Sequence, residues 1–409
     1  MRFRLAILLS AFCSLLLTAS AFAAGPYQVI GTGETREGGL IRTESLIQAG
    51  AHPLDRFRMT RLVKNIPAGQ LQGSILFLPP LGLTFAGFYE QRDPNGAPGS
   101  SIAEFFAQRN FDVYGYSPRF EGIPAGTCQA GLFDCSVMGT WDLQSMLDDI
   151  AFIRSEIERL HPGTKIVAGG ASLGGILAVA VANAAPEDYD GVFPWEGMLY
   201  SPDPQVRALN QGYCAADEAQ LAAGAVYDGV STNVFREVTR QAELSPGGPN
   251  TIPLFPPTLT GHQTLVALVS TPTPGPVTMP VPNYVQMNGS LAQDRLFYAS
   301  DERVFQDVRS FLNYAPNILV RDINCSLAGT ETDYTSNLAN YHGSVLMIGG
   351  GRGFGAYMDG QLAQFTGTTD KTLRLEPDFG HIDHFMTRFH RAYVERPIYQ
   401  WTRRVFGQP

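Results

Sequence analysis

KIVAGGASLGG, residues 165–175, is the segment that most strongly indicates the fold class. Its apolar first half predicts a buried strand, and the small and apolar residues at 173–184 predict a helix directly after Ser172. Between a strand and a helix, a G-x-S-x-G pattern holds its serine on a sharp turn at the carboxyl edge of a sheet. Gly170 and Gly174 let the strand and the helix approach each other closely, and the helix N-terminus favours developing negative charge. Ser172 is therefore the predicted nucleophile, rather than part of an ordinary glycine-rich turn.

Strand and helix patterns alternate on both sides of this turn. Short apolar runs predict strands, and apolar residues at helical spacing predict helices. Such alternation is typical of an α/β protein with a mostly parallel central sheet covered on both faces. Residues 56–64 are a further candidate, as an early antiparallel edge strand. The predicted strands are 74–78, 111–116, 165–169, 189–195, 344–348 and 372–376, and the predicted helices are 101–109, 141–160 with Thr140 as N-cap, 173–184 and 391–405.

The alternation stops between about residues 201 and 341. Polar helices are expected near 204–226, 232–244 and 293–312, around a proline-rich loop at 246–282. A structureless loop of that length inside a compact core would be unusual, so we expect an insertion over the sheet. The predicted organisation is a signal peptide (1–23), a first core part (24–199), a largely helical cap or lid insertion (200–341) and a second core part (342–409).

The N-terminus has the features of a secretory signal peptide. Arg2 and Arg4 precede an apolar run, and Ala21-Phe22-Ala23 supplies the small-residue pattern of a cleavage site. The chain is thus expected to be exported, to the periplasm or outside the cell, with a retained membrane anchor as the alternative. No later stretch is long and apolar enough to cross a bilayer. Removal of the two arginines changes the net charge from −9 to −11, and an acidic chain without a basic run argues against nucleic-acid binding.

Four cysteines remain after such processing, and an even number in an exported chain predicts two disulfides. Cys128 and Cys135 are close in sequence, which favours their pairing and leaves Cys214 with Cys325. None of the four has the Cys-x-x-Cys spacing of a zinc site, so neither a metal nor a cofactor is expected.

His381 is the predicted general base, which a serine hydroxyl needs within reach. It follows the last predicted core strand after a short turn, and Gly380 before it would let the imidazole point back across the sheet edge. Of the seven histidines, it is the only one in such a position. His384 is the competitor within the same segment, and a surface loop histidine is the alternative interpretation.

The carboxylate that would orient the histidine is ambiguous in the sequence. The usual place is the loop after the strand at 344–348, but the residues that follow it contain no acid until Asp359. Glu196 stands at the end of the strand at 189–195, next to the strand of Ser172. Both remain candidates, with Glu196 slightly preferred. Asp383 is expected to be structural, because it is too close to His381 in sequence to approach the ring from behind.

Two backbone N–H groups are expected to stabilise an oxyanion. One belongs to Leu173, directly after the nucleophile, and the other to the loop after the strand at 74–78. That loop begins with two prolines, which have no N–H to donate, so Leu81 is the expected donor and Gly82 the second choice. A stiff turn without a catalytic part is the alternative.

Together these motifs resemble the α/β-hydrolase superfamily, over residues 73–197 and 344–405. The order of serine, acid and histidine is the order of that superfamily, in which Ser172 and His381 correspond to nucleophile and base, and Leu81 and Leu173 to the oxyanion donors. The segment 379–383, FGHID, is similar to the histidine region of acid lipases. The glycine-rich loop departs from the common pattern, in which an aspartate would stand near Gly353.

Glu196 resembles the glutamate that some haloalkane dehalogenases carry at the corresponding strand end. Those enzymes use an aspartate nucleophile, so Ser172 argues against their chemistry. The resemblance implies hydrolysis of a small or lipid-like carboxylic ester through an acyl-enzyme, without a cofactor. Amide or peptide hydrolysis, acyl transfer and a non-catalytic binding protein on the same scaffold are the alternatives, and neither the natural substrate nor the oligomeric state follows from the sequence.

Overall fold

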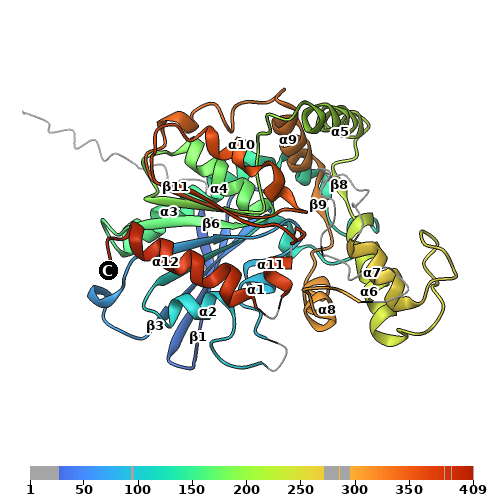
Figure 1. Cartoon of the computed structure of the whole chain (residues 1–409), viewed down its shortest axis with the longest axis horizontal. Helices are drawn as coiled ribbons and strands as arrows, with labels where there is room; N and C mark the ends of the chain where they lie inside the picture. The colour runs from blue at the N-terminus through green and yellow to red at the C-terminus, as the bar shows by residue number, and fades with distance from the viewer. Residues whose placement is uncertain are drawn as a thin grey trace, which may run out of the picture.

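A computed structural model describes residues 27–93, 96–270, 285, 295–381, 383–387 and 389–408. The predicted signal peptide lies outside the described residues. Figure 1 shows the whole chain. Within the described residues, nine strands form one sheet in the order β1-β2-β3-β5-β4-β6-β7-β10-β11. These strands are β1 (Gln28–Glu37), β2 (Leu40–Gln48), β3 (Arg56–Lys64), β4 (Ser74–Leu78), β5 (Asp112–Ser117), β6 (Ile166–Ala171), β7 (Gly191–Trp195), β10 (Ser344–Gly350) and β11 (Lys371–Glu376).

The sheet is parallel from β5 to β11, which confirms the predicted fold class. The strand predicted at 56–64 forms as β3, but it is not an edge strand, because it lies between β2 and β5 and is antiparallel to both. The edge strand on this side of the sheet is β1, whose residues are exposed along its whole length. The sequence did not indicate β1 because a strand exposed on both faces has no alternating apolar pattern.

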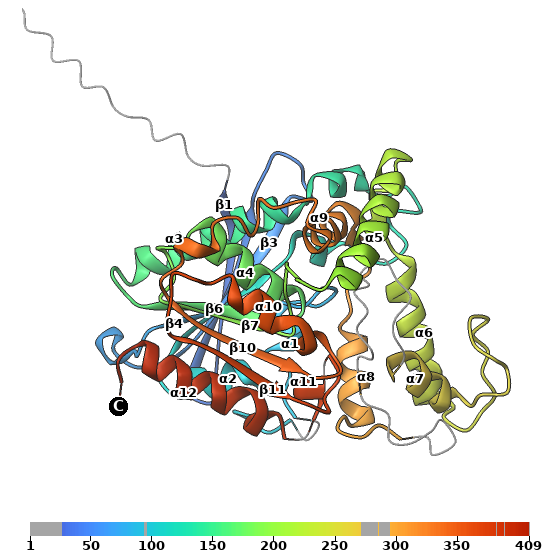
Figure 2. The same cartoon turned by 45° about the horizontal axis from the view of Figure 1, so that its top comes forward.

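Helices cover both faces of the sheet (Figure 2). Alternate residues of the central strands pack on opposite faces. Leu76 and Leu78 contribute to a core cluster with α3, α4 and α10, whereas Ile75 and Phe77 contribute to a second cluster with α1, α2 and α12. The helices are α1 (Phe85–Phe88), α2 (Ile102–Ala107), α3 (Leu143–Leu160), α4 (Leu173–Ala184), α10 (Met358–Ala363), α11 (Asp383–Met386) and α12 (Arg396–Val405).

Two of the predicted helix starts need correction. Asp142, not Thr140, is the N-cap of α3, and its side chain accepts a hydrogen bond from the Ser145 N–H at 2.8 Å. Thr140 instead ends a short 3₁₀ helix, Cys135–Thr140. The helix expected at 391–405 begins with a π-helical turn at Arg391–Glu395, and α12 follows it.

The segment between β7 and β10 is largely helical and contains a small two-stranded sheet of β8 (Tyr227–Asp228) and β9 (Ala315–Pro316). Three of its helices occur near their expected positions: α5 (Pro204–Ala222), α6 (Val230–Leu244) and α8 (Asp301–Arg309). The sequence did not predict α7 (Gly261–Ser270), which lies in the proline-rich stretch, or α9 (Asn317–Ala328). Residues 271–284 and 286–294, including the predicted start of the third helix at 293, lie outside the described residues.

This insertion packs against both faces of the core rather than standing apart (Figures 1 and 2). Leu319 and Ile323 of α9 join the cluster of α3 and α4, while Leu265 of α7 and Val304 of α8 join the cluster of α1 and α2. Among the described residues, no helix has the length and apolar character that a bilayer span requires.

The two disulfides are the pairs that the sequence favours. Cys128–Cys135 closes a short loop between β5 and α3, and Cys214–Cys325 joins α5 to α9 across 111 residues of sequence.

Candidate active site

Ser172 occupies a strained turn between β6 and α4. Its backbone has φ 56° and ψ −117°, a region that L-residues other than glycine rarely adopt. The turn is held by the surrounding backbone, because the Ser172 N–H donates to the Trp195 carbonyl at 2.8 Å and the Ser172 carbonyl accepts from Gly175 at 2.9 Å. Ser172 is only partly buried.

Close backbone contacts around this turn exclude side chains larger than hydrogen. A Cβ on Gly170 or on Gly174 would overlap the Leu78 carbonyl oxygen at the end of β4. Tyr89 fixes the same place from the other side, since its hydroxyl donates to the Leu78 carbonyl at 2.7 Å and accepts from the Ala171 N–H at 3.0 Å. Burial raises the pKa of Tyr89, so its hydroxyl stays protonated and able to donate. Tyr89 belongs to no sequence motif, so the sequence alone provided no signal for this supporting residue.

The structure brings His381 and Glu196 together. Nδ1 of His381 lies 2.9 Å from Oε2 of Glu196, and both side chains are buried, with exposures of 3% and 1%. Glu196 follows β7 directly, and β7 is the parallel neighbour of β6 with Trp195 opposite Ala171. Residues 172 and 196 therefore follow registered positions on adjacent strands. Glu196 also has a positive φ, 51°.

The glycine-rich loop after β10 surrounds the Glu196 carboxylate with backbone donors. Oε1 accepts from the N–H groups of Gly350 and Gly355, the latter at 3.2 Å, and Oε2 accepts from Phe354 at 2.9 Å. A Cβ on Gly353 would overlap Oε2 of Glu196 and lie 2.9 Å from Cα of His381. The loop thus has no acid of its own and binds the acid of the neighbouring strand. The run of glycines after β10 was the sequence signal for a loop that binds a carboxylate. In the sequence alone it indicated only that the expected aspartate is absent.

The other titratable candidates lie in different surroundings. Asp359 is exposed in α10 and accepts from its neighbour Gly360 at 2.8 Å. Asp383 accepts from the Gly380 N–H at 2.7 Å and so shapes the turn before His381. His384 is fully buried between the Trp195 and Phe379 rings, and burial lowers its pKa to about 3.

The predicted oxyanion donors lie on two segments in close contact. Leu173 is the first residue of α4, and a Cβ on Gly174 beside it would lie 3.3 Å from the Pro79 carbonyl oxygen. In the part of the chain that the structure describes, no acceptor is bonded to the N–H of Leu81 or of Leu173. The two prolines lead into a turn closed by the Leu83 N–H, which donates to the Pro80 carbonyl at 3.2 Å.

Comparison with known proteins is informative at the level of structure. No family model and no curated protein matches the sequence. Among solved structures, a candidate lipase from Sulfolobus solfataricus is similar with a TM-score of 0.61 and 16% identity, over 92% of this chain and 99% of that chain. Two others are an esterase from Thermogutta terrifontis (TM-score 0.48, 15% identity, 89% and 99% coverage) and a lipase in its open form (0.49, 14%, 93% and 100%).

At these sequence identities a structural similarity establishes the fold and not the activity. We draw no conclusion from the two matches with the lower TM-scores. The first match spans nearly the whole of both chains. This chain has the mostly parallel sheet, covered by helices on both faces, that such a match implies. The fold of this protein is therefore that of the α/β-hydrolases.

Proposed function

We propose that the protein is an exported serine hydrolase that cleaves carboxylic esters through an acyl-enzyme on Ser172. His381 acts as general base and Glu196 orients it, while the N–H groups of Leu81 and Leu173 stabilise the oxyanion. The insertion at 200–341 serves as a cap over the site. Two disulfides are compatible with export.

One observation carries this proposal: the strained serine turn and Glu196, which is paired with a buried histidine, directly follow registered residues of two adjacent parallel strands. Backbone strain of this kind persists only where the surrounding structure imposes it, and it concentrates at functional sites. A buried carboxylate bonded to Nδ1 of a histidine fixes the tautomer whose Nε2 accepts a proton. Three backbone N–H groups also bind the carboxylate and fix its position beside the imidazole.

The reaction then runs in two halves. The Ser172 Oγ attacks the ester carbonyl carbon as its proton moves to Nε2 of His381, and the carbonyl oxygen becomes an oxyanion bound by the two N–H groups. The tetrahedral intermediate collapses, the C–O bond to the alcohol breaks, and the alcohol leaves with the proton from His381. Water then attacks the acyl-serine with His381 again as base, which releases the acid and restores the Ser172 hydroxyl.

Hydrolysis of p-nitrophenyl esters from acetate to palmitate by the mature protein and by Ser172→Ala tests the proposal. The mature protein should hydrolyse at least part of the series, and the alanine variant should lose the activity, while its melting temperature stays near that of the parent. Mass spectrometry after treatment with a fluorophosphonate should locate the label on Ser172.

An anilide of matched acyl length distinguishes the amidase alternative. Faster cleavage of the anilide than of the ester would favour amide hydrolysis on the same machinery. An unlabelled Ser172 together with no cleavage of either substrate would contradict the enzymatic proposal and favour a binding protein on a hydrolase scaffold.

A further inference from the structure

Residues 310–314, here called the strap, connect α8 to β9 and cross the core loops next to the proposed oxyanion donors. Four of the five strap residues form hydrogen bonds with core segments. In the middle of the strap, the Leu312 N–H donates to the Gly82 carbonyl at 2.6 Å. Two residues earlier, Ser310 Oγ accepts from the Gln91 side chain at 3.3 Å. The strap therefore lies directly against the segment that begins with the two prolines.

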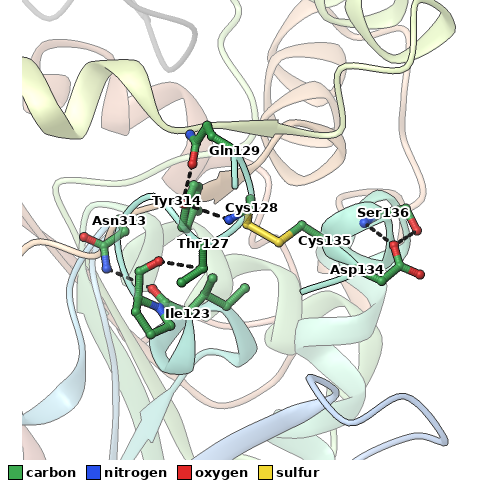
Figure 3. The surroundings of a disulfide bond; sticks show 10 residues. Ile123, Thr127, Cys128, Gln129, Asp134, Cys135, Ser136, Asn313 and Tyr314 are labelled. Carbon is green, nitrogen blue, oxygen red and sulfur yellow. Dashed lines mark hydrogen bonds between the residues drawn. A yellow bond between two sulfur atoms is a disulfide. The ribbon is translucent and has the colours of Figure 1, made fainter. Parts of the chain in front are cut away.

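The second end of the strap is anchored independently of Leu312. The Asn313 amide donates to the Ile123 carbonyl at 2.8 Å, and its oxygen accepts from Arg236 of α6. The Tyr314 hydroxyl donates to Gln129 at 2.6 Å and accepts from the Cys128 N–H at 3.4 Å (Figure 3). Gln129 lies in the short loop that the Cys128–Cys135 disulfide closes. These contacts fix the strap between the insertion and the core, so that Leu312 has a defined place.

The acceptor of the Leu312 N–H belongs to a turn with two accessible shapes. Leu83 bonds back to Pro80, and Gly82, the third residue of that turn, has φ +81°. A positive φ at this position is typical of a type II turn, and the type I turn differs from it mainly by rotation of the peptide between the second and third residues. Glycine tolerates both conformations. That peptide carries the Leu81 carbonyl and the Gly82 N–H, so its rotation would reorient the Gly82 N–H, whereas the Leu81 N–H belongs to the preceding peptide.

We propose that Leu312 is a positioning residue for the ester hydrolysis described above, on which this inference rests. Its backbone N–H holds the Gly82 carbonyl and thereby anchors the turn that carries both candidate oxyanion donors, Leu81 and Gly82. The placement of the insertion is in this way coupled to stabilisation of the transition state. Because the oxyanion forms only after the nucleophilic attack, loss of this bond should lower kcat more than it changes KM.

Replacement of the amide at Leu312 by an ester, through incorporation of the α-hydroxy analogue of leucine, removes this donor and keeps the side chain. The matched control is the same replacement at Phe311, whose N–H donates to Val308 within the insertion at 3.2 Å. We expect kcat to fall about tenfold at position 312, with KM within about twofold of the parent. The Phe311 ester should retain the parental kcat and lose a similar amount of thermal stability.

An unchanged kcat in the Leu312 ester, or equal losses of kcat in both esters, would overturn the role of Leu312. Fluorophosphonate labelling of the parent protein separates this result from a failure of the proposed function. If the parent is neither labelled at Ser172 nor active on any ester, the proposed function and this inference fail together. If the Leu312 ester does not fold, Asn313→Ala replaces it, since loss of the Ile123 anchor should also lower kcat with little change in KM. An unchanged kcat in that variant would equally contradict the proposal.

Discussion

Backbone contacts stabilise the carboxyl edge of the sheet, whereas side-chain contacts stabilise the insertion. At the edge, backbone groups bind the Glu196 carboxylate, and a Cβ on Gly170, Gly174 or Gly353 would overlap its neighbours. In the insertion, side chains connect the elements: the Cys214–Cys325 disulfide joins α5 to α9, and Arg303 lies 4.9 Å from the Phe385 ring.

This difference predicts which property a substitution in each region should change. Backbone contacts leave little room for relaxation, so a single added carbon at the edge should displace the reacting groups. Side-chain contacts in the insertion contribute to stability and can be lost one at a time. We therefore expect changes at the edge to alter kcat, and changes in the insertion outside the strap (residues 310–314) to alter the free energy of unfolding.

The largest effect is expected at the acid. Glu196→Gln should lower kcat by about three to four orders of magnitude, because an amide cannot hold the histidine in the required tautomer and charge state. Asp359→Asn is the matched control and should change kcat by less than about twofold. Ester hydrolysis and thermal melting of both variants test this. A large loss in Asp359→Asn with little change in Glu196→Gln would move the orienting role to Asp359.

The disulfide of the insertion should govern stability. The double variant Cys214→Ser/Cys325→Ser should lower the free energy of unfolding by about 3 kcal/mol, whereas Cys128→Ser/Cys135→Ser, with its short loop, should cost about 2 kcal/mol. Chemical denaturation measures both values. If the Cys214 and Cys325 variant instead lost activity at unchanged stability, the proposed division between edge and insertion would be wrong.

Two glycine substitutions compare the regions directly. Gly353→Ala should lower kcat by about ten- to a hundredfold, because the new Cβ would displace the Glu196 carboxylate from His381. Gly212→Ala in α5 meets no atom within 4 Å and should stabilise the protein by roughly 0.5–1 kcal/mol at unchanged kcat. Full activity of Gly353→Ala would show that displacement of the Glu196 carboxylate does not affect kcat.

The smallest effect concerns His384, which lies at the edge without a proposed role in catalysis. Burial lowers its pKa to about 3, while an unfolded histidine titrates near about 6.5. Between these pH values the unfolded chain binds a proton that the folded chain does not, so this residue makes stability fall as pH falls below about 6.5. His384→Phe should therefore flatten the loss of stability on acidification, and kcat at neutral pH should persist. An unchanged pH profile of the melting temperature would contradict this.

Local patterns predicted much of the fold because they depend on neighbours in sequence. The bounds of β4 and α4 coincide with the predicted ranges. A short apolar run indicates β4 and a glycine-rich turn indicates the start of α4, and both signals are local in sequence. The helix α7 was missed because its segment follows many prolines, and β1 because it is exposed throughout. Burial against other elements stabilises α7, and that contribution cannot be read from a short window.

The choice of acid shows where sequence reasoning ends. Glu196 and Asp359 were both candidates, because each follows a predicted strand of the core. Only the folded chain brings the end of β7 beside the loop after β10, where backbone N–H groups surround one carboxylate and leave the other in solvent. Three-dimensional adjacency of two strand ends has no signature in either segment alone.

By itself the sequence determined the α/β fold class, the serine turn and the favoured cysteine pairs, since each depends on a short motif or on spacing along the chain. The tertiary structure alone decided that His381 bonds Glu196, that the glycine loop binds this acid, and that Leu312 holds Gly82. These relations join residues more than a hundred positions apart, and they arise from the order of strands in the sheet and from the path of the insertion across it.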